Sequence, residues 1–187
     1  MNRRDALSAT AVLLGGVIIG SQAFLSACGP DKKEQVRFDD DDLAFLDEVG
    51  ETILPETQKS PGAKAAKIAL FMKSIVSDCY DEAEQAIFFA GIQKLKAQSE
   101  NRYQRSFLQL NADEKTALLN ELDQEAAAYG KNRQDADPEH YFNMMKQLTI
   151  WGYFSSEPGA TQALRFVPVP GRFDGCIDYH KGEGAWA

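Results

Sequence analysis

The sequence predicts an all-α protein, a single helical bundle of about five to six helices followed by an extended, turn-rich C-terminal segment. Two observations predict this class. Apolar residues recur at helical spacing between residues 43 and 149, and no segment shows the sustained alternation that is typical of strands. Prolines and glycines then become frequent after residue 152, where the helical pattern stops.

The chain begins with a segment that we expect to be a targeting signal and not part of the helical bundle. Arg3 and Arg4 precede a mostly apolar run over residues 7–27, as in a secretory signal. The arginine pair resembles a twin-arginine export signal. The sequence "LSAC" that ends at Cys28 resembles a bacterial lipobox, in which cleavage precedes the cysteine and the cysteine is acylated. One alternative is an uncleaved transmembrane helix, because the run is close to the ~20 residues that a span needs. The other is a plain soluble product.

These features divide the chain into three parts. Residues 1–27 are expected to be a twin-arginine-type lipoprotein signal peptide, residues 28–38 a polar tether, and residues 39–187 one helical domain. The whole chain of 187 residues has a net charge of −8, and the signal peptide carries +1 of it, so the mature part carries −9. This acidic balance argues against nucleic acid as a partner, since phosphate binding requires clustered lysine and arginine.

The first helix is expected to start at the aspartate run of residues 39–42 and to end at Pro55. Four aspartates can also suggest a calcium site, but they lack the alternating spacing and the later glutamate of a calcium loop. A second apolar helical pattern covers residues 63–80, and a third covers about residues 81–99.

The fourth helix is predicted by a capping box, in which Asn111 is the cap and Glu114 follows three residues later. Asp137 followed by Pro138 predicts the start of a fifth helix that runs to about residue 149. The sequence over residues 152–159 is then expected to interrupt the helix, and a short helix is expected between residues 160 and 165.

The chain carries few residues suited to catalysis. It has two histidines, and His140, near the start of the fifth helix, is expected to face solvent. The sequence lacks the zinc-protease helix motif, paired Cys-x-x-Cys ligands, the dinucleotide glycine motif and the hydrolase nucleophile elbow. We therefore expect no catalytic residues, no metal site and no cofactor in this chain.

Cys79 and Cys176 are a candidate disulfide for an exported protein, and two unrelated thiols are the alternative.

Two stretches near the C-terminus are candidates for a partner interface. The stretch over residues 150–154 places three aromatic residues beside a glycine, and the strip over residues 168–173 is held extended by its prolines. The alternative is that both stretches pack onto their own helices. The candidate interface residues are Trp151, Tyr153, Phe154, Pro168, Pro170 and Phe173.

Several of these stretches together resemble a known family. They are "ETILP" at residues 51–55, "PGA" at residues 61–63, "LTIWGYFSSE" at residues 148–157 and the proline- and glycine-rich tail, combined with the twin-arginine start. In their order and spacing they resemble the gluconate 2-dehydrogenase subunit 3 family, over most of residues 39–180.

The resemblance implies a small subunit without a redox centre, in a periplasm-facing complex that oxidises sugars or sugar acids. The large subunit would be a flavoprotein of the glucose–methanol–choline type that holds FAD, and a cytochrome c subunit with haem c often accepts the electrons. The small subunit would support folding and export of its large partner, and here Cys28 would add a lipid anchor in the cell envelope. A stand-alone lipoprotein enzyme or solute-binding module, or an envelope scaffold with an unrelated partner, remains the alternative.

Overall fold

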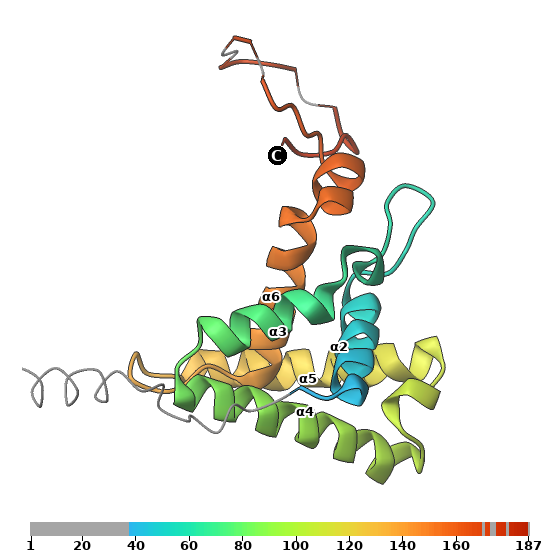
Figure 1. Ribbon diagram of the computed structural model, residues 1–187, viewed down its shortest axis with the longest axis vertical. Coiled ribbons are helices and arrows are strands. Elements are labelled where there is room, and N and C mark those ends of the chain that lie inside the picture. The colour runs from blue at the N-terminus through green and yellow to red at the C-terminus, as the bar shows by residue number, and fades with distance from the viewer. Residues whose placement is uncertain (1–37, 170, 173–174, 179, 187) are drawn as a thin grey trace, which may run out of the picture. The chain divides into compact units, whose positions relative to one another are not determined.

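The computed structural model describes residues 38–169, 171–172, 175–178 and 180–186. In this part of the chain the helices follow one another through short turns, apart from two longer loops over residues 54–62 and 133–140 (Figure 1). The α-helices are α2 (Asp40–Ile53), α3 (Ile68–Asp78), α4 (Glu82–Tyr103), α5 (Ala112–Asn132) and α6 (Tyr141–Ser155), and three single-turn segments are η1 (Ala63–Ala66), η2 (Phe107–Gln109) and η3 (Gly159–Ala163). The predicted all-α bundle is confirmed, and within the described residues the only strand-like pairing is one isolated bridge between Arg165 and Trp186.

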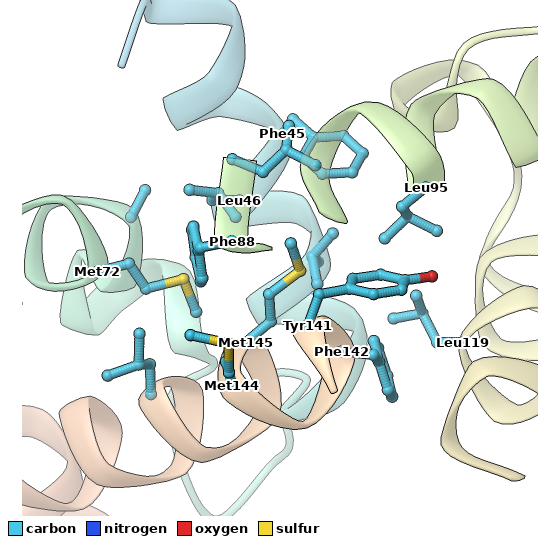
Figure 2. Close-up of a cluster of buried hydrophobic side chains, with 14 of the residues drawn as sticks. Phe45, Leu46, Met72, Phe88, Leu95, Leu119, Tyr141, Phe142, Met144 and Met145 are labelled. Carbon is cyan, nitrogen blue, oxygen red and sulfur yellow. The ribbon is translucent and has the colours of Figure 1, made fainter. Parts of the chain in front are cut away.

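All five α-helices contribute side chains to one apolar core (Figure 2). Each helix places residues three and four positions apart on its inner face, which is the spacing that one side of a helix requires. The largest fully buried side chains include Phe45, Phe88, Phe142, Met72 and Met145. No helix in the described part of the chain is both long enough and apolar enough to cross a bilayer.

Capping signals in the sequence predict two helix starts correctly. Asp39 precedes α2, and its carboxylate accepts a hydrogen bond from the Asp42 backbone N–H at 2.7 Å. The aspartate run is therefore a capped helix start. Asn111 and Glu114 form the predicted reciprocal capping box at the start of α5.

The second predicted helix is broken in two, which the sequence pattern does not indicate. Lys67 adopts the left-handed conformation, with φ of 54°, and separates η1 from α3. Its side chain caps nothing, and instead Asp47 on α2 accepts the Ala69 backbone N–H at 3.0 Å. The start of α3 is thus fixed by a tertiary contact rather than by a local signal.

Helix α6 begins three residues later than predicted. Pro138 lies outside the helix, where its carbonyl accepts a hydrogen bond from the Tyr129 hydroxyl at 2.8 Å. Asp137 accepts the Gln134 backbone N–H in a turn. His140 is the residue that caps α6, through a hydrogen bond from the Phe142 N–H to its Nδ1 atom, and its side chain is only 9% exposed. The expectation that His140 faces solvent is therefore wrong.

A partly buried charge cluster joins three elements of the bundle. Glu48 on α2 accepts hydrogen bonds from Lys115 on α5, at 2.7 Å, and from Lys64 on η1. Lys115 is itself buried, with 8% of its surface exposed. Burial raises the pKa of Glu48, but the hydrogen bonds and charges of the two lysines lower it more, so the pKa lies below its ordinary value of 4.5.

We expect Glu48→Gln to lower the free energy of unfolding by about 1–3 kcal/mol at neutral pH, because it leaves the buried Lys115 ammonium without its carboxylate. Since folding lowers the pKa of Glu48, its contribution is complete above the unfolded pKa and is lost as the pH falls through the folded pKa. Urea unfolding at pH 7 and at about pH 3 should show the difference between wild type and variant shrinking in acid. Glu121→Gln is the control, since Glu121 pairs with Arg102 on the exposed surface and should change stability little. Equal losses for both variants would contradict a special role for Glu48.

Candidate functional site

An exposed apolar surface lies on the C-terminal half of α6. Ile150, Trp151 and Phe154 are 40%, 56% and 38% exposed, respectively. They share one side of the helix, because residues three and four positions apart are neighbours on a helix surface. We call these three residues the aromatic surface. Two of them, Trp151 and Phe154, are candidates that the sequence predicts.

The Trp151 side chain packs against a residue of α3. Its ring meets the Phe71 ring of α3 edge to face, with centroids 5.2 Å apart. Phe71 comes this close because Gly152 has no side chain, and a Cβ atom there would lie 2.5 Å from the Phe71 ring. The indole therefore rests on a packed ring while its outer face remains open to solvent.

Tyr153 does not belong to the aromatic surface, and the candidate interface is wrong at this position. The side chain is 3% exposed, and its hydroxyl donates a hydrogen bond to the Pro61 carbonyl at 2.5 Å. The reason is that α6 continues to Ser155 instead of stopping at Gly152. Continued helical spacing places Tyr153 four residues after the buried Thr149, on the inner face.

The C-terminal segment forms a second exposed surface, which we call the arm (residues 166–182). Every described residue of the arm is exposed, including Phe166, Pro168 and Val169, the last at 81%. Pro170 and Phe173, two more predicted interface residues, lie outside the described residues. The base of the arm is closed by Arg165, whose backbone N–H donates to the Ala185 carbonyl at 2.8 Å.

The C-terminal end of the chain carries less net charge than the rest of the bundle. Between Lys146 and Arg165 the only charged residue is Glu157. Residues 38–157 contain 12 basic and 22 acidic residues, a net charge of −10, whereas residues 158–187 contain three of each. The cores of protein interfaces are depleted of charge and enriched in aromatic residues, so the aromatic surface has the composition of a protein-binding surface.

The predicted disulfide is absent from the structure. Cys79 and Cys176 are both free and exposed. Cys79 lies at the C-terminal end of α3, whereas Cys176 lies in the arm, which extends beyond the C-terminal end of α6 (Figure 1). The contacts of Arg165 with residues 183–186 close the arm without a covalent bridge.

Other expected site residues fall on parts of the chain that the structure leaves undescribed. Arg3, Arg4 and Cys28, the export and lipidation candidates, lie outside the described residues. Among those that are described, no three histidine, cysteine or acidic side chains are grouped so that they could hold a metal ion. Sequence reasoning missed the Arg165 contacts altogether, because nothing in the sequence pattern connects residue 165 with residues 183–186.

The fold and its exposed aromatic residues are typical of a small helical subunit that associates with another protein. The comparison with family models makes this specific. Residues 40–171 match the model of gluconate 2-dehydrogenase subunit 3, and the chain belongs to this family. Membership identifies it as a subunit of a dehydrogenase complex. No match was found among curated proteins or among solved structures.

The matched region begins at the first residue of α2 and ends inside the arm. It therefore contains the whole bundle, the aromatic surface and Arg165. Residues 183–186, which Arg165 contacts, lie beyond the match.

Proposed function

We propose that this chain is a non-catalytic subunit that binds a flavin-dependent sugar or sugar-acid dehydrogenase of the glucose–methanol–choline type. Family membership carries this proposal, and the exposed aromatic surface at the end of α6 supports it. The FAD would be held by the large subunit, and haem c by a cytochrome subunit where one is present. The chain has no dinucleotide-binding glycine motif of its own, which is consistent with a role in binding rather than redox chemistry.

We further propose that the chain escorts the flavoprotein during export and tethers it to the membrane of the bacterial cell envelope. The paired Arg3 and Arg4 support export in the folded state, which would allow FAD to be inserted before the complex crosses. The lipobox cysteine, Cys28, supports a periplasm-facing lipid anchor. Stable attachment requires more than one acyl chain, and mature lipoproteins of this type carry several.

The tether can be tested with full-length tagged chain expressed in its native host. We expect Cys28→Ser to retain the bound flavoprotein but to move most of the flavin from the membrane fraction to the soluble fraction, because the acyl anchor is lost. Bound flavin in each fraction is measured by its fluorescence after denaturation. Cys79→Ser is the matched control, since Cys79 is an exposed free thiol of the bundle.

The three outcomes separate the parts of the proposal. Flavin that stays in the membrane fraction with Cys28→Ser would show that the apolar run, and not a lipid, is the anchor. A wild-type chain that recovers no flavoprotein would overturn the binding function itself. Sugar oxidation by the purified chain without any flavoprotein would show a stand-alone enzyme.

A further inference from the structure

Arg165, at the end of η3, makes several contacts with residues 183–186. Its Nε atom donates to the Gly184 carbonyl at 2.8 Å, and its guanidinium pairs with Glu183 at 2.9 Å. The guanidinium also lies over the Trp186 ring, 4.6 Å from its centroid. Together with the backbone hydrogen bond to Ala185, these contacts form what we call the Arg165 clasp.

The clasp leaves little spare space beside Gly184. A Cβ atom on Gly184 would lie 3.2 Å from the Ala163 carbonyl oxygen and 3.7 Å from the Arg165 side chain. Close approach of residues 184–186 to the end of η3 is therefore part of the arrangement. The strand-like bridge between Arg165 and Trp186 joins the two ends of the arm at this point.

The clasp turns the arm from a free tail into a closed loop. Among its described residues, the arm exposes four large apolar side chains, each between 39% and 81% exposed: Phe166, Val167, Val169 and Ile177. Closing the two ends reduces the conformations that the arm can adopt before binding. Less entropy is then lost when a partner orders the arm, and affinity rises accordingly.

We propose that Arg165 is a positioning residue for partner binding, which holds the arm so that it and the aromatic surface meet the catalytic dehydrogenase subunit together. This inference rests on the proposed function. The arm and α6 are joined through η3, which packs against the end of α6. In Figure 1 the ribbon of the arm continues from the C-terminal end of α6, the half of the helix that carries the aromatic surface.

The net charge of the bundle favours the catalytic subunit, and not a second copy of this chain, as the partner that binds the arm and the aromatic surface. Two copies that met through this end would bring together two bundles with a net charge of −10 each. Like charges at that density oppose association. The charge-balanced, aromatic end is instead suited to an apolar surface on a different chain, and the family is defined by such a complex.

The test uses full-length chain and the flavoprotein subunit purified from the native host with its flavin bound. We expect Arg165→Gln to weaken binding about tenfold, and Arg165→Lys, which keeps the charge but not the planar contacts, to weaken it less. Trp186→Ala should act like Arg165→Gln, because it removes the other half of the stacked pair. Arg102→Gln is the matched control, since Arg102 also pairs with a glutamate and lies 5.3 Å from a tyrosine ring, but on the bundle.

Hydrogen exchange on the free chain gives a readout that is independent of the partner. The backbone amide of residue 165 donates to the Ala185 carbonyl in the wild type, and in Arg165→Gln it should exchange faster while the amides of α4 and α5 do not change. Faster exchange with weaker flavoprotein binding supports the proposal. Unchanged exchange, or faster exchange with unchanged binding, overturns it.

Two further outcomes are separate from these. A wild-type chain that does not bind the flavoprotein at all would remove the proposed function, and this inference with it. A wild-type chain that forms a dimer in solution, lost in Arg165→Gln, would show that a second copy occupies the surface and would overturn the assignment to the catalytic subunit.

Discussion

Replacing Gly91 with alanine should destabilise the bundle by about 1–3 kcal/mol, although alanine is the better helix former. Gly91 lies in α4 and packs against Tyr141, the first residue of α6. A Cβ atom on Gly91 would lie 2.5 Å from both the Cβ atom and the ring of Tyr141. The Cβ atom of Tyr141 cannot move away by a rotamer change, so the two helices must separate. Separation would loosen the core that α4 and α6 share, which includes the fully buried Phe88 and Met145.

Gly130→Ala is the matched control for this prediction. Gly130 lies in α5, and a Cβ atom there would meet nothing within 4 Å. This substitution should stabilise the protein by about 0.5–1 kcal/mol, through helix propensity alone. Urea unfolding followed by circular dichroism measures both effects. If Gly91→Ala stabilises the protein as Gly130→Ala does, the close approach of α4 and α6 is wrong.

The helices were predictable from the sequence where the signal is local. Asp39 and Asn111 cap their helices through their own side chains, so the residue type and its spacing are sufficient. The break at Lys67 was not predictable, because lysine is an ordinary helix residue and the start of α3 is satisfied by Asp47 from another helix. The start of α6 was misplaced for a related reason, since Asp137 and Pro138 form turn contacts instead of a cap.

The candidate interface was predictable only as a region. Local composition indicated the aromatic residues of α6, but it could not separate the exposed Trp151 from the buried Tyr153, because that depends on how far the helix continues. The Arg165 clasp connects residues almost twenty positions apart through an exposed loop, and such a contact has no periodic signal. Family resemblance gave the right family, whereas the burial of Tyr153 and the contacts of Arg165 required the structure.

Trp151→Ala should weaken binding of the flavoprotein subunit by about 2 kcal/mol, or ~30-fold, while leaving the bundle folded. Trp151 has the features of an interface anchor. It is a large aromatic residue, it is more than half exposed in the free chain, and its ring is already fixed against Phe71. A fixed ring loses little side-chain entropy on binding, so most of its burial contributes to affinity.

The same exposure means that the substitution should change stability little, since the indole is mostly in solvent before binding. Titration of the purified flavoprotein measures the affinity, and urea unfolding measures the stability of each variant. Leu108→Ala is the control, because Leu108 is 44% exposed but lies on η2, between α4 and α5. Equal affinity for wild type and Trp151→Ala would place the interface elsewhere on the chain. An equal loss for Leu108→Ala would mean that binding depends on exposed apolar area in general, and a specific anchor at the end of α6 would then be ruled out.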